Sequence, residues 1–156
     1  MKLIGALIII FSSLIIGAEL SRGVERAGRS VSALRAVLEH TKNMIECYSL
    51  PSGEILRRLD RSVLGNCGYT KSDAPTDFCS FAEGMNVADA EARELFLSFA
   101  KDFGKSYRQD ELSRCSLYLE KMRAREQKLI KESAKKKKVI FTVAICSALA
   151  VIILII

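Results

Sequence analysis

Two uncharged apolar runs stand near the ends of this 156-residue chain, at residues 3–18 and 139–156. At about 1.5 Å of rise per residue, the second run would make a helix about 27 Å long, close to the hydrocarbon thickness of a bilayer. We therefore predict an N-terminal transmembrane anchor over residues 1–20. Residues 135–156 are predicted to form a basic collar followed by a C-terminal anchor.

The first run is the shorter one, and a cleaved signal peptide is its competing interpretation. Lys2 would supply the basic start, and Gly17-Ala18-Glu19 is the nearest approach to a cleavage site. Large isoleucines precede that tripeptide, whereas signal cleavage sites are built from small residues. We therefore favour an uncleaved anchor.

Residues 21–134 have apolar positions at helical spacing and no alternating strand pattern, which predicts an all-α domain. One helix is expected to start at Ser30 and to end before Pro51, because proline does not fit a helix interior. Its apolar face comprises Val31, Leu34, Val37, Leu38, Met44, Ile45 and Tyr48. A second helix follows Pro51, and its apolar side comprises Ile55, Leu56, Leu59 and Val63.

The remaining domain is predicted from turn and cap residues. Residues 65–68 have turn chemistry and open a loop. Thr76 is expected to be the N-cap of a short helix that ends near Gly84. Another helix should begin at Val87 or Asp89, with Gly104 closing it in a left-handed conformation. A last helix starts near Asp110 and runs on into the second apolar run. The predicted fold is a small bundle of about five helices in antiparallel pairs, flanked by two transmembrane helices.

The net charge of +6 is unevenly distributed along the chain. Residues 21–120 carry 14 basic and 15 acidic side chains, whereas residues 121–138 carry 9 basic and 2 acidic ones. A basic block beside an apolar run is typical of a topology signal and of contact with lipid headgroups. Binding to nucleic acid is disfavoured because no aromatic residue lies between Lys121 and Lys138.

The charges that flank the two runs also predict the topology. Cytoplasmic segments next to membrane spans are enriched in lysine and arginine. The cytoplasm is therefore expected to hold the domain, with both termini across the membrane. The residues that decide this are Arg22, Arg26, Arg29, Lys135, Lys136, Lys137 and Lys138.

A Gly-Lys-Ser sequence at residues 104–106 matches the end of a phosphate-binding loop. That loop needs an earlier glycine at position 99, where this chain has Phe99, and it needs a preceding strand rather than a helix. Residues 102–104 also match a kinase triplet, without the catalytic-loop sequence that should precede it. We interpret the segment as a glycine-capped helix end.

No other motif predicts catalysis or metal binding. His40 is the single histidine and is interpreted as a polar residue on a helix surface. The five cysteines are irregularly spaced, and a cytoplasmic domain would keep them as free thiols. A disulfide between Cys67 and Cys79 is the alternative if the domain is extracytoplasmic. We predict a protein that is not an enzyme, without catalytic, cofactor-binding or metal-binding residues.

Two features leave room for a protein partner. Asp89, Glu91 and Glu94 lie at the start of a predicted helix, where acidic residues complement the helix dipole. A solvated helix start is the simpler interpretation, and a partner contact is the alternative. The apolar stripe from Leu112 to Ile130 should pack in the core, although its length would also accommodate a partner helix or a homo-oligomer.

The order of these segments resembles a known family. A leading KLIGALIII anchor has a basic exit, and the helix of residues 34–48 is followed by the sequence LPSGE at residues 50–54. Phe103-Gly104-Lys105-Ser106 then precedes a long helix and a terminal anchor. In these features the chain resembles stage III sporulation protein AB of endospore-forming bacteria. It departs from the usual family pattern at Tyr107, where the family often has an acidic residue, and at Glu111, near which the family often has glutamine.

The resemblance implies a structural platform subunit of a secretion-like channel between mother cell and forespore, required for spore development. Its domain would be similar to the helical cytoplasmic domain of type II secretion platform proteins. Its partners would be other stage III channel proteins and a secretion-type ATPase, at the outer forespore membrane on the mother-cell side. The alternative is a secreted helical interaction domain with a signal peptide and a C-terminal anchor.

Overall fold

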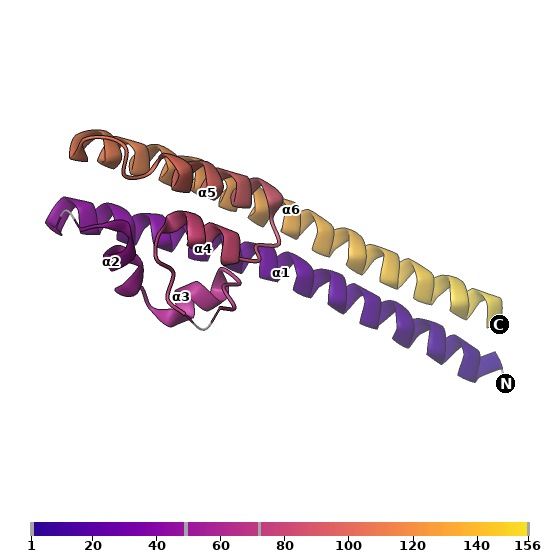
Figure 1. The fold of residues 1–156 in the computed structure, drawn as a ribbon. Helices are drawn as coiled ribbons and strands as arrows, with labels where there is room; N and C mark the ends of the chain where they lie inside the picture. The colour runs from indigo at the N-terminus through magenta and orange to yellow at the C-terminus, as the bar shows by residue number, and fades with distance from the viewer. Residues whose placement is uncertain (1, 49, 72, 156) are drawn as a thin grey trace. The chain divides into compact units, whose positions relative to one another are not determined.

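The computed structural model describes residues 2–48, 50–71 and 73–155, without several side chains of the two terminal segments. Every regular element among these residues is an α-helix, which confirms the all-α part of the predicted fold. The elements, drawn in Figure 1, are α1 (Lys2–Tyr48), α2 (Ser52–Arg57), α3 (Arg61–Asn66), α4 (Phe78–Gly84), α5 (Ala90–Asp102) and α6 (Arg108–Ile155).

The chain divides into two compact units. The first consists of residues 1–26 and 129–156, so it contains the first part of α1 and the last part of α6. The second consists of residues 27–128 and contains α2, α3, α4 and α5 together with the remaining turns of the two long helices. Within the described part of the chain, no helix combines the length and the apolar character that crossing a membrane requires.

In the unit of residues 27–128, α1 and α6 run antiparallel. Arg35 pairs with Glu126, and further along α1, Glu39 pairs with Arg123. At the end of α1, Arg108 donates a hydrogen bond to a backbone carbonyl of the last helical turn. As the residue numbers rise along α1, the numbers of their partners on α6 fall, which is the pattern of two antiparallel helices. Both helices consequently leave this unit at the same end.

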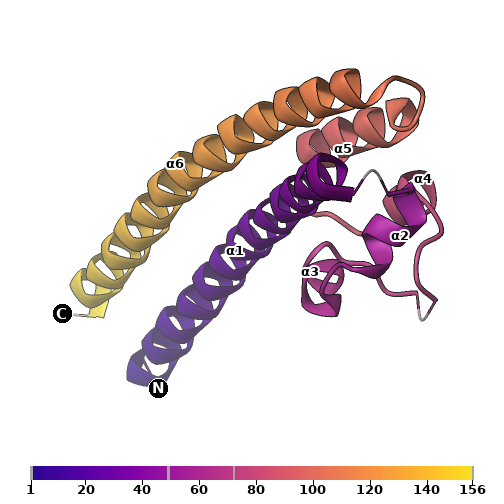
Figure 2. The same cartoon turned by 90° about the vertical axis from the view of Figure 1, so that its left-hand side faces the viewer.

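Aromatic rings form the centre of this unit. Phe78 and Phe81 from α4 face Phe96 and Phe99 from α5, and all four side chains are fully buried. Their rings pack edge to face, with the Phe81 and Phe96 centroids 5.5 Å apart. This geometry places the positive edge of one ring against the negative face of another. Figure 2 shows α4 and α5 in the second orientation. The long helices complete the core with Val31, Leu34, Val37, Leu38, Cys115, Leu119 and Met122.

The first helix differs from the prediction. We expected a helix start at Ser30, but α1 continues without a break from Lys2 to Tyr48. Ser30 lies inside this helix, where its hydroxyl donates to the carbonyl of Ala27 at 3.0 Å. Serine can make such a bond without ending a helix, and an isolated glycine is also tolerated in a helix interior. The predicted start at Ser30 is therefore wrong.

The segment after Pro51 forms two short helices where we expected one. Asp60 separates α2 from α3 and accepts a hydrogen bond from the backbone N–H of Ser62 at 2.9 Å, as an N-cap does. We expected a turn over residues 65–68, but α3 continues through Asn66. Only residues 67 and 68 are therefore left for the turn, and Gly68 has a φ of +73°.

The remaining helix boundaries are close to the expected ones, although one predicted N-cap residue is wrong. Asp77, and not Thr76, is the N-cap of α4, and a capping box with Ser80 closes this end. The predicted end near Gly84 and the predicted start at Asp89 are confirmed. The last helix begins two residues earlier than expected and continues to Ile155, as predicted.

Candidate functional site

The turn between α5 and α6 gathers the polar groups of the FGKS segment. α5 ends at Asp102, and Gly104 then adopts a left-handed φ of +82°, which glycine tolerates without steric cost. The Glu111 carboxylate faces this turn. Its Oε1 accepts hydrogen bonds from the backbone N–H groups of Gly104 at 3.1 Å and of Ser106 at 3.2 Å. A buried carboxylate thus satisfies the exposed amides of the turn.

These hydrogen bonds decide how the Gly-Lys-Ser sequence is interpreted. A phosphate-binding loop presents free backbone N–H groups to its ligand. Here the N–H groups of Gly104 and Ser106 already bind the carboxylate of Glu111, which has the charge that a phosphate would bring. The segment is therefore a glycine-capped helix end, as predicted.

Arg114 supplies the counter-charge for Glu111. Its Nη1 lies 2.9 Å from Glu111 Oε1 and also donates to the carbonyl of Asp102. Its Nη2 donates to Ser106 Oγ at 3.0 Å. One guanidinium group therefore joins the end of α5, the turn and the second turn of α6. Hydrogen bonds in which the donor or the acceptor is charged are roughly twice as strong as neutral ones.

Arg108 extends the same site to the end of α1. Its Nε donates to the carbonyl of Ile45 at 3.1 Å, and its Nη2 donates to the carbonyl of Glu46. The last carbonyls of a helix have no partner inside the helix, so this side chain acts as a C-cap from another element. A cavity of about 400 Å³ lies beside it. The cavity is lined by Ile45, Leu50, Pro51, Phe103, Arg108 and Glu111, among others.

Asp89 forms a second polar site between α5 and α6. As the N-cap of α5 it accepts a hydrogen bond from the N–H of Ala92 at 2.8 Å. Arg125 binds the same carboxylate with two hydrogen bonds, from Nε to Oδ1 at 3.0 Å and from Nη2 to Oδ2 at 2.7 Å. The hydrogen bond from Arg125 is the main cause that lowers the pKa of Asp89, and burial opposes it.

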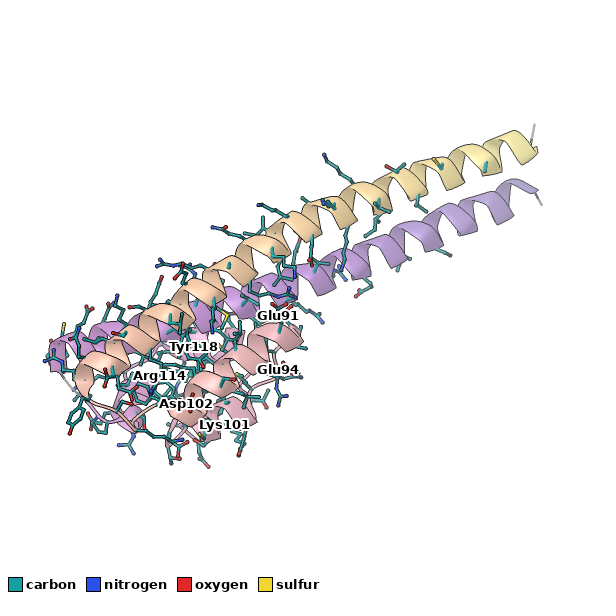
Figure 3. The ribbon with its side chains drawn as sticks, turned by 90° about the horizontal axis from the view of Figure 1, so that it is seen from above. Glu91, Glu94, Lys101, Asp102, Arg114 and Tyr118 are labelled. Carbon is teal, nitrogen blue, oxygen red and sulfur yellow. The ribbon has the colours of Figure 1, made fainter. Side chains whose placement is uncertain are left out.

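The three acidic residues predicted as a partner contact have different surroundings. Asp89 is 7% exposed and belongs to the fold itself. Glu91 is more exposed, and its Oε2 lies 2.6 Å from Nη1 of Arg125. Glu94 is exposed. Figure 3 labels Glu91 and Glu94 on the first half of α5. The partner contact stays a prediction, which the structure narrows to these two glutamates.

A third polar site links α1 to α6 through Glu39. Its Oε1 accepts hydrogen bonds from Arg35 at 3.0 Å and from Arg123 at 2.8 Å. Arg35 also lies 3.0 Å from Glu126 of α6. The hydrogen bond from Arg123 is the largest cause that lowers the pKa of Glu39. These pairs help to set the register of the two helices.

The residues predicted to decide the topology belong to α1 and α6, and those with described side chains are exposed. Arg22 makes an exposed ion pair with Glu19 at 2.7 Å. The other described members of the set are exposed: Arg26, Arg29, Lys135, Lys136 and Lys138. The side chain of Lys137 lies outside the described residues. Their effect on orientation stays a prediction.

The histidine and the cysteines are dispersed. His40 is half-buried on α1, with its Nε2 covered and without a hydrogen-bond partner among the described residues. Cys67 and Cys79 are free thiols in this structure, and burial raises the pKa of Cys67 to about 12. No group of three or more histidine, cysteine or acidic side chains in the described part of the chain could hold a metal ion.

The sequence analysis missed the arginines that organise these sites. Arg108 and Arg114 are 62 and 12 residues away from carbonyls that they bind, and Arg125 is 36 residues away from Asp89. No local pattern encodes such distances. Glu111 has a partial signal, because an acidic residue in the first turns of a helix can satisfy nearby N–H groups.

Comparison with known proteins identifies the family. No curated protein and no solved structure matches the chain. A model of the family described as stage III sporulation protein AB matches residues 2–77 and 81–156. The match covers nearly the full length, including the turn of residues 103–106 and both long helices. The chain belongs to the stage III sporulation protein AB family.

Proposed function

We propose that this sporulation protein is a non-enzymatic platform subunit of a secretion-like channel between mother cell and forespore. The observation that carries the proposal is the antiparallel pairing of α1 and α6 in the unit of residues 27–128. Because both helices leave that unit at one end, both apolar runs can enter the same membrane from the same side. A platform subunit needs this arrangement, with a folded unit held against a membrane by both ends of its chain.

The terminal segments support anchoring in the membrane. The runs of residues 3–18 and 139–156 contain no charged side chain. Among their described side chains, Ile15, Val139 and Val143 are each about 60% exposed. Exposed apolar side chains along continuous helices suit a lipid environment better than water. The proposed location is the outer forespore membrane, with residues 27–128 in the mother-cell cytoplasm.

The charged side chains mainly hold the fold together, which supports a structural subunit. Asp89 and Glu111 are the carboxylates that are buried among the described residues. Asp89 caps α5, Glu111 holds the turn before α6, and both bind arginines of α6. The partners that we propose are other stage III channel proteins, a secretion-type ATPase and further copies of this chain. Glu91 and Glu94 are the proposed contact on α5.

The continuous α1 helix supports an uncleaved first segment. α1 passes through residues 17–19, the nearest approach to a cleavage site, without a break. N-terminal sequencing of the mature protein from sporulating cells separates the two models. The platform proposal expects a start at residue 1 or 2. A start near residue 19 would favour a secreted domain with one anchor.

Crosslinking in sporulating cells tests the platform function. A photoreactive amino acid at Glu94 should crosslink to a stage III channel protein or to the ATPase. The same probe at Glu83, an exposed glutamate in the last turn of α4, is the matched control. Probes along residues 89–130 that yield no crosslink to any sporulation protein would contradict the proposal.

A further inference from the structure

Three lysines of α6 form one exposed face in the unit that contains the chain ends. Lys131, Lys135 and Lys138 are spaced by four and three residues, which places them on the same side of a helix. All three are exposed. We call this set the lysine face. Lys136 is exposed too, but on a different side of the helix.

The lysine face lacks the carboxylate partners that four arginines of the other unit have. In residues 27–128, Arg35, Arg114, Arg123 and Arg125 each bind a carboxylate. Among the described residues, no carboxylate lies within ion-pair distance of the lysine face. Three like charges on one helix face repel each other when nothing neutralises them. The face is therefore well suited to an external anion.

The next residues indicate which anion this is. Directly after Lys138, the side chains of Val139 and Val143 are each 61% exposed. A cationic face followed at once by an exposed apolar one matches the interface between lipid headgroups and acyl chains. Lysine also suits this position because its aliphatic stem can lie along apolar surface while the ammonium reaches the headgroup level. A soluble acidic protein would leave the two valines unexplained.

We propose that the lysine face binds the phosphate groups of anionic phospholipids. This inference rests on the proposed anchoring of the chain in a membrane. Each basic residue near an anionic bilayer contributes about 1 kcal/mol, so three lysines correspond to about a hundredfold in the binding constant. The site would hold α6 at a fixed depth and favour membrane regions that are rich in anionic lipid.

Lipid binding to the full chain in uncharged detergent tests the proposal. Phosphatidylglycerol and phosphatidylcholine with the same acyl chains are added separately, and bound lipid is measured by native mass spectrometry. The wild-type chain should prefer phosphatidylglycerol. The triple variant Lys131→Gln, Lys135→Gln and Lys138→Gln should bind phosphatidylglycerol about a hundredfold more weakly, with phosphatidylcholine binding unchanged. Glutamine has a helix propensity similar to that of lysine, so α6 should remain folded.

A matched control separates the lysine face from net charge. Lys71, Lys101 and Lys105 are exposed residues of the other unit, and changing all three to glutamine removes the same charge. This control variant should keep the lipid preference. Millimolar inorganic phosphate should not displace the lipid; displacement would indicate a site for free phosphate. Equal loss in both triple variants, or no loss in the first, would overturn the proposal.

Membrane insertion is scored separately by alkaline carbonate extraction of cell membranes. If the chain resists extraction while the lysine variant keeps its phosphatidylglycerol preference, the lipid site is wrong and the anchors stand. If carbonate releases the wild-type chain, the proposed anchoring is wrong, whatever the lipid measurement gives.

Discussion

Arg125 binds Asp89 through two hydrogen bonds, one to each carboxylate oxygen, at 3.0 and 2.7 Å. The two side chains are 13% and 7% exposed. Asp89 also caps α5, so one carboxylate joins the start of α5 to the middle of α6. A fork-shaped guanidinium fixes orientation as well as distance. This contact therefore holds α5 in the position from which its phenylalanines reach the core.

Replacing Arg125 should destabilise the unit of residues 27–128. Arg125→Ala leaves the Asp89 carboxylate largely buried with only its cap hydrogen bond, a change that costs about 3 kcal/mol. Arg93→Ala, at an exposed position of α5, is the control and should change stability by less than about 0.5 kcal/mol. Hydrogen exchange of α5 amides in the full chain measures both. Equal protection in the two variants would contradict the structural role of Arg125.

The same contact predicts a loss of stability in acid. The folded-state pKa of Asp89 lies below its ordinary value of 3.8, chiefly because of the hydrogen bond from Arg125. The stabilisation is therefore fully present above the unfolded-state pKa and is lost as the pH falls through the folded-state pKa. Asp89→Asn should lower stability at neutral pH and flatten its decline below pH 3.8. Glu94→Gln, at an exposed position of the same helix, should leave that decline unchanged.

Glu111 should tolerate glutamine better than alanine. Glu111→Ala removes the acceptor of the N–H groups of Gly104 and Ser106 and the carboxylate partner of Arg114, at a cost of about 2–4 kcal/mol. Glu111→Gln keeps a carbonyl oxygen for the two N–H groups and should cost about 1 kcal/mol. Asp110→Ala, at the exposed neighbouring position, controls for general effects at the start of α6. Thermal unfolding followed by circular dichroism ranks the stability of the three variants. If Glu111→Ala and Asp110→Ala lowered stability equally, the role of Glu111 in holding the turn would be contradicted.

Two glycines with similar backbone angles should respond differently to alanine. Gly104 has a φ of +82° with open space around it, so Gly104→Ala meets only backbone strain of about 1–2 kcal/mol. At Gly68, with a φ of +73°, a Cβ atom would also lie 2.3 Å from the backbone oxygen of Asn86. Gly68→Ala should therefore lower the unfolding temperature clearly more than Gly104→Ala. The reverse order would show that Asn86, in the loop after α4, does not approach Gly68 as closely as described.

Local sequence patterns predicted most of the helices because their causes are local. Gly84 and Gly104 mark the ends of α4 and α5, and Pro51 precedes α2. Errors arose where two local preferences competed. A serine such as Ser30 can cap a helix or lie inside one. Here the residues on both sides of Ser30 are helical, so it lies inside α1. Asp60 is an equally good cap, and it interrupts a segment whose apolar spacing alone suggested one helix.

The polar sites were harder to predict because their partners are remote in the sequence. The acidic cluster was recognised at Asp89, but its arginine lies 36 residues away on another helix. The FGKS turn was correctly interpreted as a helix end, whereas the carboxylate that closes it was not identified. Which side chains pair between two helices depends on the register of the helices. That register cannot be predicted from the residue spacing within one helix.

The location of residues 27–128 is tested most directly by cysteine labelling in growing cells that express the chain, because the outer side of their membrane is open to reagents. Cys47 and Cys79 are exposed and serve as single-cysteine reporters, whereas Cys67 is buried with a pKa of about 12 and would react poorly. A membrane-impermeant maleimide should label both reporters only after permeabilisation. Labelling in intact cells would place the folded unit outside the cytoplasm and contradict the platform account.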